Sequence, residues 1–184
     1  MNKSALRQQM KTRRQKISLA IQREAAALLA QRTRHLKEFI HSKRIALYWA
    51  FQNEIDPNGI LHLAHLEKKS IYLPVLDEQH QALHFAKYQP GDKLIKNRFG
   101  VLEPLPIHLI AAEQLDLVFT PLLAFDRHGN RLGSGQGYYD RTFAFSKQAK
   151  KKRPHFIGLA YDWQEVSQLE PDTWDVKLDK VITP

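Results

Sequence analysis

The chain of 184 residues contains no cysteine. Disulfide bonds, thiolate nucleophiles and cysteine-ligated metals are therefore excluded as sources of stability or of chemistry. A chain of this length can bury roughly 70% of the surface that its unfolded form exposes, so it needs no covalent crosslink to be stable. The length predicts a single domain that spans residues 1–184.

Long apolar runs are also missing. No stretch approaches the roughly 20 apolar residues that a membrane helix requires. The first 16 residues, MNKSALRQQMKTRRQK, lack the apolar core of a secretory signal. The sequence therefore predicts a cytoplasmic protein without a membrane partner.

Acidic residues are scarce near the N-terminus. Residues 1–44 contain 12 lysines and arginines but only Glu24 and Glu38, a balance of +10, whereas residues 45–184 have 16 basic and 17 acidic side chains. Three interpretations stay open: a solvated helical face, a transit peptide, and a surface that binds nucleic acid or a small polyanion. Leu29 and Phe39 indicate a helix face docked on a core, which disfavours the transit peptide.

Apolar periodicity predicts helices that alternate with strands. Ser18 is a candidate N-cap, and Asp56 followed by Pro57 is a helix-start signal. The expected helices cover residues 4–16, 19–39, 56–69 and 137–150. The expected strands cover residues 44–51, 70–76, 82–88, 115–125, 155–161 and 181–183, with residues 97–106 irregular and turns at 90–91 and 126–129. This alternation predicts an α/β fold: an open, largely parallel sheet flanked by helices in a Rossmann-like three-layer arrangement, with basic N-terminal helices.

Two further clusters have simple interpretations. The run KKKR at 150–153 is expected to be an exposed helix end, which the helix dipole favours. His62 and His65 are the only close pair among nine histidines. Without a cysteine or carboxylate at ligand spacing, this pair indicates a surface helix rather than a metal site.

Three of the eight glycines alternate within RLGSGQGYYDR (131–141). The loop follows a strand and precedes a helix, where backbone N–H groups can approach an anion. Its spacing fits neither a P-loop nor the G-x-G-x-x-G fingerprint of dinucleotide sites. Taken alone, the glycines are also compatible with a flexible turn between strand and helix.

The neighbours of these glycines favour a functional site. Arg131 and Arg141 can pair with phosphates bidentately, and Asp140 is an oxygen ligand suited to Mg²⁺. Tyr138 and Tyr139 can stack on a planar ring or donate a hydrogen bond. Together these side chains predict a site for a magnesium-complexed nucleotide.

The longer segment DLVFTPLLAFDRHGNRLGSGQGYYDR (116–141) resembles the signature of the 5-formyltetrahydrofolate cyclo-ligase family. Further blocks resemble the family in the same order: Lys3-x-x-Leu6-Arg7, YWAFQNEI (48–55), NRFGVLEP (97–104) and VKLDKVIT (176–183). The chain departs from the family pattern at Leu122, where glycine is usual, and at Gln136, where some members have lysine.

The resemblance implies an enzyme that uses ATP and Mg²⁺ to convert 5-formyltetrahydrofolate, possibly polyglutamylated, into 5,10-methenyltetrahydrofolate through a phosphorylated formyl intermediate. It implies that Arg131 and Tyr138 are catalytic and that Asp140 and Asp179 bind Mg²⁺. The ATP phosphates are assigned to Lys3, Arg7, Arg131, Leu132, Gly133, Ser134, Gly135, Gln136, Gly137, Tyr138 and Tyr139. The folate is assigned to Arg7, Trp49, Phe51, Glu54, Phe99, Ser134 and Tyr138, with Glu54 on the pterin.

Each assignment has a structural alternative. Trp49 and Phe51 can be core residues, Glu54 can favour the start of the following helix, and Asp179 can be merely exposed. A nucleic-acid-binding module that uses the basic N-terminal helices is the alternative from another class, and few aromatic side chains in that segment disfavour it. Another nucleotide-dependent enzyme on the same scaffold also stays open.

Overall fold

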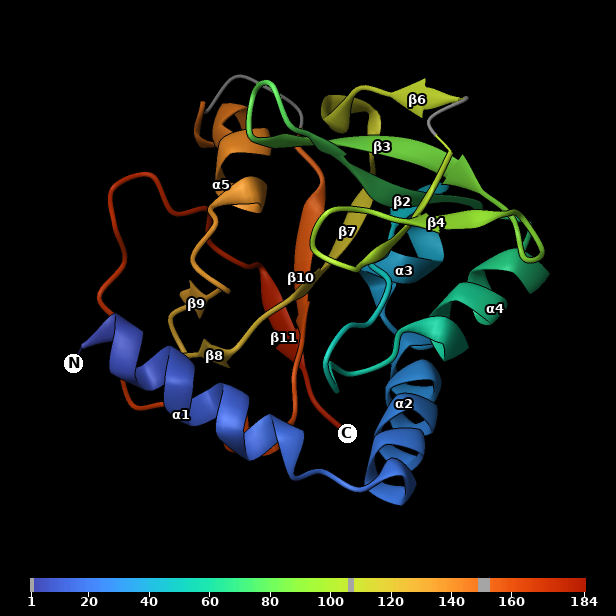
Figure 1. Ribbon diagram of the computed structural model, residues 1–184. Helices are drawn as coiled ribbons and strands as arrows, with labels where there is room; N and C mark the ends of the chain where they lie inside the picture. Colours follow the sequence, from blue (N-terminus) through green and yellow to red (C-terminus); the bar gives the residue numbers. More distant parts are fainter. Residues whose placement is uncertain (1, 106–107, 149–152) are drawn as a thin grey trace.

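The computed structural model describes residues 2–105, 108–148 and 153–184. Its centre is a seven-stranded sheet of order β11-β10-β7-β1-β2-β3-β6 (Figure 1). The four pairs from β11 to β2 are parallel, and β3 joins β2 and β6 by antiparallel pairing. The strands are β1 (Arg44–Ala46), β2 (Ser70–Asp77), β3 (Ala82–Tyr88), β6 (Leu109–Ile110), β7 (Leu117–Pro121), β10 (His155–Leu159) and β11 (Lys180–Ile182).

Helices cover both faces of the sheet, as Figure 1 shows. Alternate residues of each central strand point to opposite faces, so Leu117 and Phe119 join one core cluster and Val118 joins the other. The first face packs against α2 (Leu19–Thr33), α3 (Lys37–His41) and α4 (Asn58–Leu66). The second packs against α5 (Tyr138–Thr142) and the 3₁₀ helix η2 (Ala144–Lys147) through Phe143. The expected largely parallel, three-layer α/β fold is confirmed.

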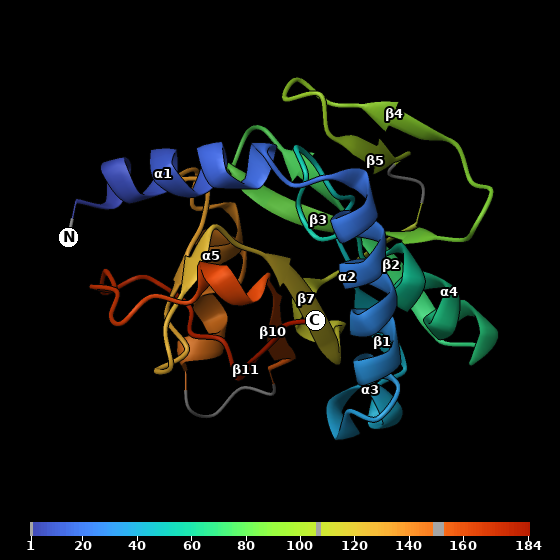
Figure 2. The same ribbon diagram turned by 90° about the horizontal axis from the view of Figure 1, so that it is seen from below.

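The first helix, α1 (Lys3–Gln15), lies apart from these layers, beside the hairpin of β8 (Ala124–Phe125) and β9 (Arg131–Leu132) (Figures 1 and 2). Leu6 and Met10 form its apolar stripe and pack on Leu123, Leu132 and Leu169. The neighbouring face of the helix, which carries Arg7, is thereby held close to the loop that follows β9.

Hydrogen bonds of one carboxylate shape the β8–β9 turn at the expected position. Asp126 accepts the N–H groups of His128 (2.9 Å), Asn130 (3.0 Å) and Leu169 (2.9 Å). Gly129 has φ +80° and would place a Cβ 2.5 Å from the carbonyl oxygen of Leu178, so only glycine fits there. The turn therefore ties the hairpin to the C-terminal segment.

The predicted helix over residues 19–39 is divided in two. Ser18 caps α2 as expected, its Oγ accepting the N–H of Ile21 at 3.4 Å. The chain then leaves the helix after Thr33, and Leu36 is extended (φ −75°, ψ 127°) before α3. This break turns Phe39 into the core, where it is fully buried. Neither glycine nor proline marks it, so no local signal predicts it.

Helix α4 is shorter than expected, and its cap is shifted by one residue. Asp56 Oδ1 accepts the N–H of Asn58 at 2.9 Å, so the side chain caps the helix although Pro57 occupies the N-cap position. The helix ends at Leu66, and Lys68 adopts φ +57°. Asp56 therefore caps the helix as predicted, whereas the predicted C-terminal end of the helix is wrong by about one turn.

Two other predictions are corrected. Residues 97–106 are not irregular throughout, because β4 (Leu94–Lys96) and β5 (Leu102–Pro104) form an antiparallel hairpin next to β2 (Figure 2). The helix expected over 137–150 is reduced to α5 and η2. Of the run KKKR, residues 150–152 lie outside the described part of the chain.

The remaining 3₁₀ turns are η1 (Ala112–Gln114) and η3 (Asp162–Gln164). None of the described helices is long and apolar enough to cross a membrane.

Candidate functional site

A cavity of about 620 Å³ opens where the connections after β1 and β7 diverge. From β1 the chain proceeds toward β2, whereas β7 lies on the other side of β1 and leads to β10. Ligands of open α/β sheets bind at such switch points, beyond the carboxyl ends of the strands. All the site residues expected from the sequence line this cavity except Asp179: Lys3, Arg7, Trp49, Phe51, Glu54, Phe99, Arg131, Leu132, Gly133, Ser134, Gly135, Gln136, Gly137, Tyr138, Tyr139 and Asp140.

The glycine loop has a backbone that only glycine adopts easily. Gly135 and Gly137 have φ values of +104° and +67°. The carbonyl oxygen of Gly133 accepts a hydrogen bond from Arg7 Nε at 3.0 Å. A Cβ on Gly133 would meet nothing within 4 Å, so the loop backbone faces open space in the cavity. A ligand can therefore approach these main-chain atoms closely.

One ion pair closes the base of the loop. Arg131 Nη2 lies 2.7 Å from Asp140 Oδ1, and the two side chains are 7% and 20% exposed. The same Oδ1 accepts the N–H of Val176 at 3.0 Å, and Arg131 Nη1 donates to the carbonyl of Val176. Within the described chain both bonds to Asp140 end on Oδ1, so Oδ2 retains its lone pairs.

Helix α1 contributes four cations to the cavity: Lys3, Arg7, Lys11 and Arg14. Lys3 pairs with Asp172 at 2.6 Å, and Arg14 pairs with Glu54 at 3.3 Å. Lys11 and Arg14 were missed by sequence reasoning. Lys3, Arg7, Lys11 and Arg14 follow one another at intervals of four, four and three residues, which places all four on one face of the helix. This spacing is the signal that could have found the two missed residues.

The other end of the cavity has apolar walls and two carboxylates, those of Glu54 and Glu103. Phe99 of the β4–β5 hairpin is 42% exposed and meets Tyr138 edge-to-face, with ring centroids 6.2 Å apart. Trp49 contacts Tyr88 in the same geometry. Glu54 Oε2 accepts the N–H of Phe51 at 3.1 Å. Burial raises the pKa of Glu54, and the adjacent Arg14 opposes that effect.

Two of the site residues expected from the sequence, Tyr139 and Asp179, are engaged by other parts of the protein. Tyr139 packs on Phe143, and burial raises the pKa of its hydroxyl far above the ordinary value. Asp179 is outside the cavity lining: it precedes β11, at the opposite ends of the parallel strands. Its carboxylate pairs with Arg153 at 2.5 and 2.9 Å and accepts the N–H of Phe156 at 2.8 Å.

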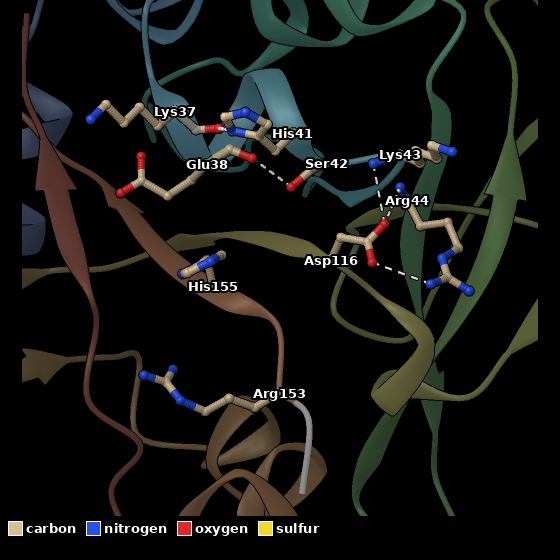
Figure 3. A pocket seen from close by; sticks show the side chains of 9 residues that line it. All are labelled: Lys37, Glu38, His41, Ser42, Lys43, Arg44, Asp116, Arg153 and His155. Carbon is tan, nitrogen blue, oxygen red and sulfur yellow. Dashed lines mark hydrogen bonds and ion pairs between the residues drawn. The ribbon is translucent and has the colours of Figure 1, made fainter.

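A second cavity of about 790 Å³ lies at those opposite strand ends (Figure 3). Its lining consists of Lys37, Glu38, His41, Ser42, Lys43, Arg44, Asp116, Arg153 and His155. Asp116 accepts the N–H groups of Lys43 and Arg44 as well as Arg44 Nη2 at 3.2 Å. In this lining, Arg44 pairs with Asp116 and Arg153 pairs with Asp179.

The described residues contain no cluster of three histidine, cysteine or carboxylate side chains arranged to hold a metal. Mg²⁺ commonly takes one or two carboxylates and completes its shell with water and substrate phosphates. Asp140, with one carboxylate oxygen unengaged next to the glycine loop, fits such a site.

The first cavity therefore has main-chain groups and cations at one end, and apolar side chains with the Glu54 carboxylate at the other. This combination at a sheet switch point is typical of an α/β enzyme with a ligand site at the carboxyl ends of its strands. The model of the 5-formyltetrahydrofolate cyclo-ligase family matches residues 1–184. The chain belongs to this family, and the expected class of enzyme, an ATP-dependent ligase, is confirmed.

Curated relatives and solved structures agree with this family. The 5-formyltetrahydrofolate cyclo-ligase of Haemophilus influenzae is 38% identical over 184 residues, covering 96% of both chains. That of Escherichia coli K12 is 33% identical over 178 residues, covering 95% of this chain and 96% of the relative. The 5,10-methenyltetrahydrofolate synthetase structure from Aquifex aeolicus has a TM-score of 0.82 at 30% identity, covering 98% and 89% of the two chains. The Mycoplasma pneumoniae structure has a TM-score of 0.77 at 26% identity, covering 100% and 99%.

Proposed function

We propose that this protein converts 5-formyltetrahydrofolate into 5,10-methenyltetrahydrofolate with consumption of ATP and release of ADP and phosphate. Family membership over residues 1–184 supports the activity. The observation that carries the proposal is that one cavity brings the glycine loop, the cations of α1 and the aromatic wall together. These groups come from segments far apart in sequence: Arg7 of α1 and Gly133 of the loop, which share a hydrogen bond, are separated by 126 residues.

The chemistry requires activation of a formamide, whose oxygen is a poor leaving group. The formyl oxygen takes the terminal phosphoryl group of ATP, so the P–O bond to ADP breaks as the new P–O bond forms. Nitrogen 10 of the folate then attacks the same carbon and gives up its proton. Phosphate departs with the former formyl oxygen as the ring closes. Positioning and charge neutralisation can supply most of the rate enhancement in such transfers.

We assign the phosphate end of the cavity to the glycine loop and the cations around it. Arg131 and Tyr138 contact the reacting groups, and the main chain from Leu132 to Tyr139 approaches the phosphates. Lys3 and Arg7 neutralise charge from α1, where Arg7 Nε already lies 3.0 Å from the Gly133 carbonyl. Arg7, Ser134 and Tyr138 line the cavity that contains both the phosphate end and the folate end. We therefore place these three residues where ATP and folate meet.

We assign the folate end to Trp49, Phe51 and Phe99, which offer flat apolar surfaces. Glu54 accepts hydrogen bonds from the amino-pyrimidine edge of the pterin. A carboxylate has about four acceptor positions, and Glu54 uses one on each oxygen within the described structure. Positions therefore remain on both oxygens for two substrate N–H donors.

We assign Mg²⁺ to Asp140, whose Oδ2 is available beside the loop. The ion supplies charge neutralisation between the phosphates when it is bound. Asp179 was expected to share this role, but it engages Arg153 at the other end of the strands. The proposal therefore rests on Asp140 as the metal-ligating carboxylate.

The basic N-terminal segment suits a small polyanionic ligand better than a nucleic acid. Arg13 and Lys16 are exposed, whereas four cations of α1 line the cavity. Their position next to the loop matches the charge of ATP and of a folate that carries glutamates. This observation favours the enzyme over the nucleic-acid-binding module.

The test follows the absorbance of the methenyl product with 5-formyltetrahydrofolate, ATP and Mg²⁺. We expect turnover that stops when ATP is omitted or replaced by a non-hydrolysable analogue. Arg131→Ala is expected to abolish it. Arg127→Ala is the matched control, because Arg127 lies in the same hairpin, is 85% exposed and pairs only with Glu165 in the described structure. Product formation without ATP, or none under any nucleotide condition, would contradict the proposal.

A further inference from the structure

A buried ion pair joins α1 to the folate end of the cavity. Arg14 is only 4% exposed, and its Nη1 lies 3.3 Å from Glu54 Oε1. Glu54 is held on its other oxygen by the N–H of Phe51, and its side chain is 20% exposed. A buried charge requires a partner of opposite sign and good hydrogen bonds. Arg14 and Glu54 supply the opposite charge to one another through one hydrogen bond, whereas Arg14 Nε is buried without a hydrogen-bond partner among the described residues.

The loop that carries Glu54 is attached to α1 at a second point. Gln52 and Asn53 have φ values of +49° and +60°, a conformation that non-glycine residues rarely adopt. Asn53 Nδ2 donates to the carbonyls of Arg14 (3.3 Å) and Gln15 (3.5 Å). The end of α1 therefore holds both the backbone of this loop and its carboxylate.

The other ionisable groups around Glu54 do not replace Arg14. Tyr48 donates its hydroxyl to the carbonyl of Ile55 at 2.7 Å. Burial raises the pKa of both Tyr48 and Tyr139, so these phenols stay neutral. Asp56 Oδ1, in the same loop, accepts the N–H of Asn58 at 2.9 Å. Among the described residues, Arg14 is thus the cation in contact with the Glu54 carboxylate.

We propose that Arg14 is a positioning residue for the folate: it holds the Glu54 carboxylate ionised and directed into the cavity, so that the remaining lone pairs can accept substrate N–H groups. This role rests on the proposed function of the site. Arg14 itself need not touch the folate, because it acts through Glu54. It also explains why a folate-binding carboxylate can lie on a buried loop next to an acidic neighbour.

The role predicts a specific pH effect. Burial raises the pKa of Glu54, and Arg14 lowers it. Removal of the guanidinium leaves burial opposed only by the N–H of Phe51, so the pKa of Glu54 rises further and the carboxylate becomes protonated at a higher pH. The acid limb of kcat/KM for folate must then move to higher pH. Loss of packing alone would lower activity without moving that limb.

The experiment compares Arg14→Met with Arg13→Met in steady-state assays with the full chain. Arg13 is the matched control, because it lies in the same helical turn but stacks on Trp163, 4.6 Å from the ring centroid. For Arg14→Met we expect KM for 5-formyltetrahydrofolate to rise about tenfold, equivalent to about 1.4 kcal/mol. KM for ATP stays within about twofold, and the acid limb moves up. Arg13→Met shows neither change in folate KM nor a shifted limb.

Three further variants make the result decisive. Arg14→Lys restores a cation and is expected to return the acid limb toward its original position. Arg14→Gln keeps an N–H donor without the charge, so it reproduces the shift even if Arg14→Met fails to fold. In a Glu54→Gln background, Arg14→Met is expected to add less than about twofold to the folate KM, because coupled residues are not additive.

The possible failures are distinguishable. Absence of ATP-dependent turnover in the unaltered protein overturns the proposed function itself. Turnover in that protein, together with an unmoved acid limb in both Arg14→Met and Arg14→Gln, overturns the positioning role. A full tenfold effect in the Glu54→Gln background also overturns it, because Arg14 would then act on the substrate directly.

Discussion

Arg131 and Asp140 stand at the two ends of the glycine loop, and their side chains meet with Nη2 2.7 Å from Oδ1. Both also bind the main chain of Val176, Arg131 at its carbonyl and Asp140 at its N–H. The loop is therefore closed at its base by a pair that is anchored to a third segment. Such closure fixes the loop before a ligand arrives, which lowers the entropy cost of binding.

This relationship predicts the behaviour of Asp140→Asn. The amide oxygen can still accept the N–H of Val176, so we expect the thermal unfolding midpoint to change by only a few degrees. The charge that Mg²⁺ and Arg131 require is lost, so turnover should fall by about a hundredfold or more. Circular dichroism melting and the methenyl absorbance assay measure the two effects.

Asp162→Asn provides the matched control for this variant, because Asp162 is exposed in η3 and lies outside the cavity lining. It should retain both stability and activity. An Asp140→Asn protein with full activity over a range of Mg²⁺ concentrations would remove the metal assignment.

The glycines of the loop are expected to differ from one another. Gly135→Ala places a side chain at φ +104°, which should lower the free energy of unfolding by about 1–2 kcal/mol. Gly133→Ala meets no positive φ and no atom within 4 Å, so its unfolding free energy should change by less than about 0.5 kcal/mol. Urea denaturation of both variants measures the difference, and equal losses would refute the conformational argument.

Asp116 predicts a pH dependence of stability. Burial opposes its ionisation, but Arg44 and the N–H groups of Arg44 and Lys43 outweigh burial and lower the pKa to about 2. A carboxyl group whose pKa is lowered by folding stabilises the native state above its ordinary value of 3.8, and this contribution disappears as pH falls toward 2. Because the side chain is partly exposed, we expect on the order of 1–2 kcal/mol.

The measurement compares wild type with Asp116→Asn by urea unfolding at pH 6 and at about pH 3. The gap in unfolding free energy should be larger at pH 6 and should narrow at the lower pH. Glu38 also contributes at acid pH, since the ammonium of Lys180 lowers its pKa. Both proteins share that effect, so it cancels in the comparison. A gap that is constant or wider at pH 3 would contradict the prediction.

Much of the fold follows from local sequence because its strands are short, apolar and bounded by turn residues. The strands over residues 70–76 and 82–88 were placed almost to the residue. Others were not predictable from local signals. In the hairpin of β4 and β5, Ile95 pairs with Glu103 eight residues along the chain, and the end of α2 at Thr33 is followed by the burial of Phe39. Pairing and burial of this kind depend on partners that a local window does not contain.

For the site, residue type and spacing in the sequence by itself determined the glycine loop and the charged and aromatic side chains next to it. The family resemblance added Lys3, Arg7 and the aromatic residues after β1. Only the tertiary structure decided which of them act together. It brought Arg14 onto Glu54 across 40 residues and placed Asp179 beside Arg153. The physical reason is that parallel strands gather residues by strand end: those after β1 and β7 meet in one cavity, whereas Asp179, which precedes β11, lies at the other edge.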